Sequence, residues 1–296
     1  MNAPAKFDLE APAVSTRNPT PADLEITVRD RRFARGIEAR RWWLNGDPVA
    51  TAWMNALSAT FPRGEAFFIE SVKAFRDGAD PKLAAEIRAF VKQEINHTRE
   101  HVAFNRMAQD HGYDIGAIDK RVEELLAEFK DRPMILNLAA TMALEHFTAM
   151  LGHELLKNPA HLEGADGDLG DLWRWHSAEE VEHKGVSYDT WLHATRDWSR
   201  FRRWKVKSLM MVLVTVRFIK HRSEDAMELL AQDGLTGWKW RFKLAHYLLV
   251  KPGFLRRIVP GWLAYFMPGF HPWNEDDRAL INIYEGDFED ALMPAA

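Results

Sequence analysis

The sequence predicts an all-α protein. Gly (17) and Pro (14) are sparse among the 296 residues for a fold rich in β-turns, and the alternation of apolar and polar residues that marks a strand is hard to find. Apolar residues recur instead at steps of three and four over long stretches, which is the spacing of one helix face. With 47% hydrophobic and 28% charged residues, the chain has the composition of a folded globular protein.

The chain contains no cysteine. This excludes disulfides, thiolate metal sites, iron–sulfur clusters and cysteine nucleophiles, so any metal must be held by His, Asp and Glu. The first residues lack the basic start and apolar stretch of a signal peptide. We therefore expect a cytoplasmic protein. Three segments are predicted: a flexible arm at 1–25, a helical bundle at 26–200, and a basic, aromatic helical extension at 201–296 packed on the bundle.

The helices of the bundle can be placed in chain order. Helical patterning begins near Ala50, and Phe-Pro-Arg-Gly at 61–64 interrupts it because proline cannot continue a helix. Pro81 suits the first turn of a later helix. The main helices are expected after Gly64, from Pro81 past Phe104, between Pro133 and Leu156, and between Leu169 and Trp191. A shorter helix, Lys120 to Lys130, is predicted in the long connection between the second and third of these.

Three of these helices carry ionisable side chains in the middle of an otherwise apolar stripe. The stripes are Leu83, Ile87, Phe90, Glu94, His97, His101, Phe104; then Met134, Leu138, Thr141, Glu145, Thr148, Gly152; then Leu169, Trp173, His176, Glu180, His183, Ser187. An unpaired buried carboxylate costs several kcal/mol. No Lys or Arg lies on these stripes, so bound metal cations are the most economical compensation.

The ionisable residues also follow a known order. Along the chain they are Glu65, Glu94-x-x-His97, Glu145 and Glu180-x-x-His183. Dinuclear carboxylate proteins built on four-helix bundles use this order, with one Glu from each of two helices and one Glu-x-x-His from each of the other two. Residues at i and i+3 share a helix face, so Glu94 and Glu180 are the expected bridges between two metals. We therefore predict a ferritin-like four-helix bundle.

Carboxylate and imidazole ligands predict two metal ions, with iron expected and manganese or zinc as alternatives. His176, one turn before Glu180, is a candidate seventh ligand or else a hydrogen-bonded core histidine. His101, one turn beyond His97, is expected to orient a ligand. The competing interpretations are a surface helix-start carboxylate for Glu65, a solvated face for Glu145 and a buried ion-pair network for the others. Other glutamates off the stripes are expected on solvated faces: Glu70, Glu100, Glu154, Glu179 and Glu182.

A second motif overlaps the first Glu-x-x-His. His97-Thr98-Arg99-Glu100-His101 reads H-x-x-E-H, the inverted zinc-peptidase motif, in which the two histidines would bind zinc and Glu100 would act as base. It leaves the ligand candidates on the other helices unexplained, so we favour the dinuclear interpretation.

The stretches FPRGEAFF, QEINHTREH and EEVEHKG resemble a bacterial family described as predicted metal-dependent hydrolases, which is assigned to the ferritin-like group. The resemblance runs from about Ile26 to the PGFHPW stretch near the C-terminus. His176-x-x-x-Glu180-x-x-His183 is similar to the pattern of the di-iron arylamine N-oxygenases, and this likeness implies a seventh ligand at His176. It extends to the metal shell only.

Carboxylate-rich ligation favours a di-iron oxidase or oxygenase that uses O₂ on a small organic or amphiphilic substrate. An external electron donor would be needed, because the chain has no nucleotide-binding motif. The alternatives are a metal-dependent hydrolase that uses a metal-bound hydroxide, and a non-catalytic metal-binding or redox-sensing bundle.

The segment from Phe201 to Arg257 holds 13 Lys and Arg against 4 Asp and Glu, although the whole chain has a net charge of −4. Its apolar run, Ser208 to Val216, is too short to cross a bilayer, which takes about 20 residues. Interleaved aromatic and basic residues suit a lipid-like substrate and peripheral contact with the inner face of an anionic membrane. A helical cap with those aromatics in its core is the alternative. A homodimer is compatible with the sequence, and no nucleic-acid partner is expected.

Overall fold

The computed structural model describes residues 20–292, and this part of the chain is all-α. It contains helices joined by loops, one isolated β-bridge between Leu44 and Ala165, and no strand. The predicted fold class is therefore confirmed. The flexible arm predicted at 1–25 lies mostly outside the described residues.

The helices run in the following order. They are α1 (Pro48–Ser58), α2 (Phe61–Lys73), α3 (Pro81–Asp110), α4 (Gly116–Ala127), α5 (Met134–Lys157), α6 (Leu169–His183), α7 (Val186–Ala194), α8 (Arg200–Gln232), α9 (Trp238–Leu249), α10 (Phe254–Arg257), α11 (Val259–Ala264) and α12 (Arg278–Leu292), with short 3₁₀ turns at Pro159–His161 and Pro272–Asn274. The predicted short helix is α4, displaced by a few residues. The predicted fourth long helix is interrupted at Lys184-Gly185, between α6 and α7.

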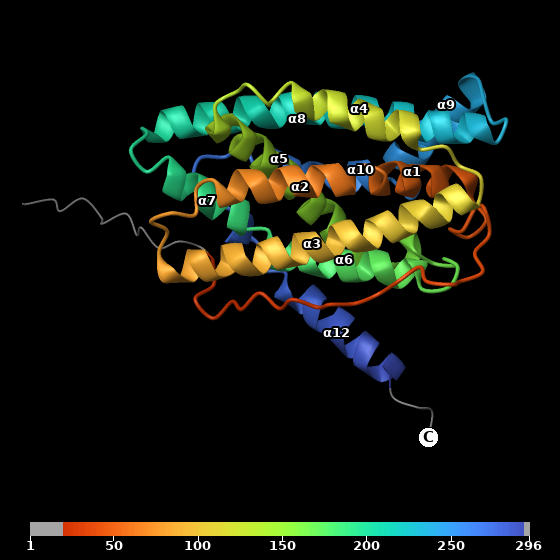
Figure 1. Cartoon of the computed structure of the whole chain (residues 1–296), viewed down its shortest axis with the longest axis horizontal. Coiled ribbons are helices and arrows are strands. Elements are labelled where there is room, and N and C mark those ends of the chain that lie inside the picture. The colour runs from red at the N-terminus through yellow and green to blue at the C-terminus, as the bar shows by residue number, and fades with distance from the viewer. Residues whose placement is uncertain (1–19, 293–296) are drawn as a thin grey trace, which may run out of the picture.

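Four helices enclose the centre of the molecule. Helix α2 packs on α3 and α5, and α6 packs on the same two helices, so the four close into a ring (Figure 1). Helix α8 covers α1 and α5 on one side. The predicted stripe residues face inward: Phe90 and Phe104 on α3, Leu138 on α5 and Leu169 on α6 are all fully buried.

Local sequence fixes where the long α3 begins and where α5 can approach α6. Asp80 precedes Pro81 and accepts the backbone N–H groups of Lys82 and Leu83, which caps the first turn. Gly152 lies on α5 against α6, and a Cβ added there would stand 3.0 Å from the carbonyl oxygen of Ser177. The missing side chain therefore permits the close approach of two helices that carry predicted ligands.

An extended segment, residues 27–35, runs along α3 and α6; we call it the strap (Figure 1). Its backbone N–H groups donate to carboxylates: Thr27 to Glu182 at 2.9 Å, Arg29 to Glu179 at 2.8 Å, and Phe33 to Glu100 at 2.8 Å. Glu100, Glu179 and Glu182 are consequently buried, and the expectation that they lie on solvated faces is wrong. The stripes identified only the face that each helix turns toward the other helices, whereas the strap buries a second face.

The two remaining off-stripe glutamates, Glu154 and Glu70, differ from each other in exposure. Glu154 is buried, against the prediction, and its Oε1 lies 2.8 Å from Nε2 of His161. Glu70 is exposed, as predicted.

Arg29 joins the strap to both α6 and α12. Its guanidinium donates to Glu182 with Nη1 at 3.0 Å and Nη2 at 3.1 Å, and its Nε donates to Glu285 of α12 at 3.0 Å. Burial raises the pKa of Glu182 although the guanidinium of Arg29 lowers it. Without Arg29 the charged form of this carboxylate would be less stable still.

Among residues 20–292, one helix is long and apolar enough to cross a membrane by length and composition alone. It is α5, and 72% of the residues in its most apolar stretch are buried inside the protein. That is the property of a core helix in a folded domain.

Replacing Arg29 with Met should lower the free energy of unfolding by about 3–5 kcal/mol, because it leaves a buried carboxylate without its cation. The matched control is Arg32→Met, three residues further along the strap, where the partner Asp30 is exposed and the cost should stay below about 1 kcal/mol. Urea denaturation measures both. Equal losses in the two variants would show that Arg29 does not compensate the buried charge.

Candidate metal centre

The structure brings all seven predicted ligands to the centre of the helix ring. They are Glu65 on α2, Glu94 and His97 on α3, Glu145 on α5, and His176, Glu180 and His183 on α6, and none is more than 4% exposed. The surface interpretation of Glu65 and the solvated-face interpretation of Glu145 are therefore wrong. Within this set, ligand atoms fall into groups that lie within 4.8 Å of one another and could hold a metal ion.

The hydrogen bonds of His183 determine which of its nitrogens faces the centre. Gln93 uses its amide N–H₂ to donate to the strap and to Glu182, so its Oε1 must accept the N–H of His183 Nδ1, at 2.9 Å. This leaves a lone pair on Nε2. That nitrogen lies 3.3 Å from Glu94, 3.4 Å from Glu145 and 3.4 Å from Glu180.

His97 is held in the same way from the other side. Its Nε2 lies 2.9 Å from Glu179 Oε2, an acceptor, so Nε2 carries the proton. The lone pair on Nδ1 faces Glu180 Oε1 at 3.6 Å and Glu94 Oε2 at 3.7 Å. A partner that fixes the outer nitrogen of a histidine and frees the inner one is the usual companion of a metal-binding imidazole.

The two histidines define two positions, and Glu94 and Glu180 reach both of them. Glu94 turns Oε1 toward His183 and Oε2 toward His97, while Glu180 turns Oε2 toward His183 and Oε1 toward His97. Glu65 groups with Glu94 and His97 at one position. At the other position Glu145 groups with Glu94 and His183. This is the placement expected of two bridging carboxylates and two terminal ones.

A chain of hydrogen bonds fixes the tautomer of His176. Ser58 donates its single hydroxyl proton to Asn105 Oδ1 at 2.7 Å, so it accepts from Nδ1 of His101 at 2.8 Å. His101 Nε2 then accepts from His176 Nδ1 at 2.6 Å. The remaining nitrogen of His176, Nε2, turns a lone pair toward Glu180 Oε1 at 2.8 Å. Two acceptors at that distance need a cation on which both converge.

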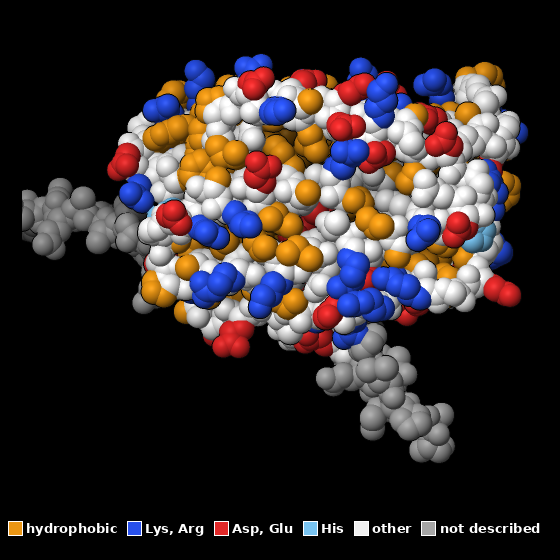
Figure 2. Space-filling view, in the orientation of Figure 1, with side chains coloured by type: hydrophobic (Ala, Val, Ile, Leu, Met, Phe, Trp, Pro, Cys, Tyr) orange, Lys and Arg blue, Asp and Glu red, His pale blue; other side chains and the backbone are white. Residues whose placement is uncertain are grey.

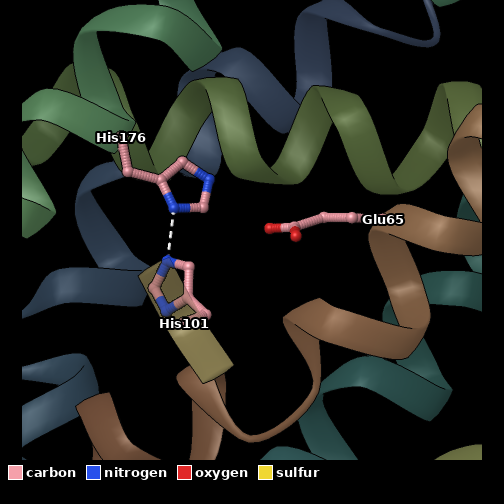
Figure 3. A group of neighbouring side chains, drawn as sticks. All are labelled: Glu65, His101 and His176. Atoms are coloured by element: carbon pink, nitrogen blue, oxygen red, sulfur yellow. Dashed lines mark hydrogen bonds between the residues drawn. The ribbon is translucent and has the colours of Figure 1, made fainter. Parts of the chain in front are cut away.

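Glu65 approaches from α2, opposite this pair of histidines (Figure 3). Its carboxylate points toward His176 and His101, and an oxygen of Glu65 lies within 4.8 Å of a ring nitrogen of each. The hydroxyl of Thr98 donates to Glu65 Oε2 at 2.6 Å. Its Oε1 is buried and has no hydrogen-bond partner among the described residues.

The centre as a whole holds many buried polar atoms without a hydrogen-bond partner among the described residues. They are Oε1 of Glu65, both carboxylate oxygens of Glu94 and of Glu145, Oε2 of Glu180, Nδ1 of His97 and Nε2 of His183. Such atoms are rare in native proteins because each costs about 1–3 kcal/mol. Two ligand atoms bound at right angles to one metal ion, each at about 2.1 Å, lie about 3.0 Å apart. The distances between the histidine nitrogens and the carboxylate oxygens of the centre are close to this. The residues therefore fit a metal site.

Burial raises the pKa of Glu145 to about 8 and raises that of Glu65 well above its usual value. Burial lowers the pKa of His176 to about 4, which keeps it neutral and able to bind a metal. For His97, burial lowers the pKa, but the neighbouring carboxylates of Glu179 and Glu94 outweigh it and raise the pKa to about 10, so without a bound cation this imidazole would itself carry a positive charge. The field at the centre thus strongly favours positive charge.

The H-x-x-E-H motif does not form a site. Glu100 points to the strap, where it accepts the N–H of Phe33 and pairs with Arg35 at 3.0 Å. His101 faces His176 and Ser58, and it shares no metal-binding group with His97 within residues 20–292. The zinc-peptidase interpretation is therefore not supported.

Sequence reasoning missed the residues that orient the ligands. Glu179 and Gln93 each immediately precede a predicted ligand, so they lie about 100° away around the helix and off the stripe. Ser58 ends α1 in a segment without a motif. The only hint in the sequence was a second polar residue, Gln93 or Glu179, directly before each Glu-x-x-His.

Residues 27–276 match the model of a protein family described as predicted metal-dependent hydrolase. The match contains the strap and all the residues of the centre, and it confirms the resemblance noted from the sequence motifs. No curated protein and no solved structure matches the chain.

If the centre holds the predicted two ions per chain, replacing Glu94 or Glu180 with Ala should reduce the bound metal to less than one, because each carboxylate reaches both positions. Glu86→Ala is the matched control: Glu86 is also buried on α3 but pairs with Lys82 at 3.0 Å, and this variant should keep both ions. Elemental analysis of the purified proteins measures the content. A full complement in both Glu94→Ala and Glu180→Ala would place the metal elsewhere.

Proposed function

Because the chain belongs to the family of predicted metal-dependent hydrolases, we propose that it is an enzyme with a dinuclear metal centre. The observation that carries this proposal is the set of three histidines that turn their lone pairs toward buried carboxylates lacking hydrogen-bond partners. The ligands that we propose are Glu65, Glu94, His97, Glu145, His176, Glu180 and His183. Helices α2, α3, α5 and α6 form the ferritin-like bundle that presents them.

The donor set indicates which metals would bind. Four carboxylates with three imidazoles suit iron, with manganese and zinc as alternatives. Glu94 and Glu180 are the bridging ligands, and Glu65 and Glu145 are terminal. His101 does not bind metal but fixes His176 through its hydrogen bond.

Hydrolysis is the reaction that the family description favours. We take an ester or amide as the bond that is cleaved. When bound, the metal pair would supply Lewis-acid activation of the carbonyl group and of water. The chain itself orients the ligands through the hydrogen-bond partners of the histidines, and its apolar surroundings exclude bulk water. Those surroundings strengthen every electrostatic contact with the reacting group.

One observation favours a second function, the O₂-dependent oxidation of an organic substrate by two irons. The cavity that touches Glu180 and His176 is only about 20 Å³, and most of its lining is apolar. Such a space holds about one small molecule of the size of water or O₂. An oxidase of this kind would take electrons from an external donor.

We propose further that the protein is cytoplasmic and contacts the inner face of an anionic membrane. Trp238 and Phe242 on α9 are 81% and 65% exposed, and Lys239, Arg241 and Lys243 lie among them in the chain. The alternative interpretation of this segment, a cap with aromatic core residues, fits Tyr265 beyond it, which is fully buried. A homodimer and the lack of a nucleic-acid partner stay predictions from the sequence.

The reaction can be tested on protein loaded with iron or zinc without O₂. Hydrolysis predicts turnover of p-nitrophenyl esters in the absence of O₂, lost in Glu180→Ala and retained in Glu86→Ala. Inert esters together with O₂ uptake by the ferrous protein would favour oxidation instead. If neither occurs in protein that holds two ions per chain, the centre is not catalytic.

Membrane contact predicts that the protein sediments with anionic vesicles at low salt and stays in the supernatant at high salt. Changing Arg256 and Arg257 to Glu should weaken the association, since each basic residue near the surface adds about 1 kcal/mol. Neutral vesicles are the control. Wild-type protein that stays in the supernatant with anionic vesicles at low salt would contradict the proposal.

A further inference from the structure

An apolar cavity of about 150 Å³ lies between α2, α4, α5 and α8. Phe68 of α2, Leu125 of α4, Leu144 of α5 and Phe218 of α8 contribute to its wall. Figure 2 shows hydrophobic side chains gathered between α2 and α8 on this face of the molecule. Protein interiors are normally packed without voids larger than a water molecule, and a dry cavity of about this size can bind benzene.

The charges around this cavity have one sign. Two arginines line it, and none of its described lining residues is acidic. Arg222 is buried and held by Asp225 at 2.6 Å. Arg217 is 35% exposed, and its only ion pair among the described residues, 2.7 Å, is with the exposed Glu128. Of the two lining arginines, Arg217 is therefore the one that a ligand entering from solvent can reach.

The apolar cavity adjoins the metal centre. Phe61 and Thr148 line both this cavity and the cavity of about 20 Å³ that touches Glu180. The ring centroid of Phe61 lies 4.8 Å from that of His176 and 4.5 Å from that of His101. Phe61 thus stands between the apolar cavity and the centre.

We propose that this cavity binds the substrate, an apolar anion in which a short alkyl chain or an aromatic ring carries a carboxylate. The carboxylate faces Arg217, and the apolar part points inward to Phe61. The reacting group is then the end of the molecule opposite the anion. Phe61 is a positioning residue that limits how far the apolar part reaches. This inference rests on the proposed function, because it makes the cavity the entrance to that centre.

Three features argue for this occupant. The cavity volume suits a ring or about six carbons, the cation lies at the solvent side, and the inner wall is shared with the cavity beside Glu180 and His176. A neutral ligand would offer Arg217 no partner beyond the exposed Glu128. A ligand with its anion inward would place a negative charge beside the carboxylates of the centre, which is unfavourable.

Binding of hexanoate and of 1-hexanol to the full-length chain tests the proposal by calorimetry, before and after removal of metal by chelation. Hexanoate should bind about fivefold more tightly than hexanol, as expected of a half-exposed ion pair worth about 1 kcal/mol. Arg217→Gln should remove that preference and leave hexanol binding unchanged. Arg202→Gln, an exposed site on the same helix, is the matched control and should change neither affinity.

Two further variants locate the ligand. Leu125→Trp, at a half-buried wall position, should weaken both ligands at least tenfold by filling the cavity. Phe61→Ala should let longer chains such as decanoate bind as tightly as hexanoate. Circular dichroism and metal analysis of each variant separate a loss of the cavity from a loss of fold or of metal.

The outcomes are distinct. Unchanged binding in Leu125→Trp, or no binding by either ligand, overturns the cavity as a ligand site. Equal binding of hexanoate and hexanol overturns the anionic class of substrate. Because binding is measured in the metal-free chain as well, it can succeed where the dinuclear centre fails and fail where that centre is intact.

Discussion

Negative charge concentrated in the core is the constraint on which this structure depends. Four carboxylates meet where water is excluded, and most of their oxygens have no hydrogen-bond partner among the described residues. Isolated carboxylates in such surroundings would take up protons, and they would not be held at the spacing observed. Three parts of the structure hold this charge in place for cations. They are the ring of helices, the hydrogen-bond partners of the histidines, and the strap.

Much of this centre could be predicted because its ligands interrupt the apolar stripes of long helices. Glu94 and His97 are recognisable from their i, i+3 spacing, and the same logic applies to Glu180 and His183. The neighbours that orient them could not be predicted. Glu179 points away from the stripe, and its burial depends on the strap, an extended segment without helical period that approaches from far away in the chain. The apolar period of a helix identifies the face that packs on other helices. It does not predict which segments cover the remaining faces.

The ligand set and the access route determine different aspects of function, namely which metals bind and which molecules reach them. Carboxylates and imidazoles determine which cations can bind, and this set suits several metals and more than one reaction. The reaction depends more on what can reach the ions. Here a narrow space beside Glu180 adjoins a wider apolar cavity across Phe61. Selectivity would therefore lie in α2, α4 and α8 as much as in the helices that supply most of the ligands.

The double engagement of Arg29 has a consequence for the order in which the protein can be completed. Glu182 and Glu285, the two carboxylates that Arg29 binds, lie 153 and 256 residues further along the chain. During synthesis the strap can therefore contact α6 about a hundred residues before Glu285 is made. The strap acquires its full set of contacts only when α12 has emerged, so the cover over the centre is completed in two stages. Nascent chains would pass through a stage with the ligands gathered and the cover still loose, which is a natural moment for metal to enter.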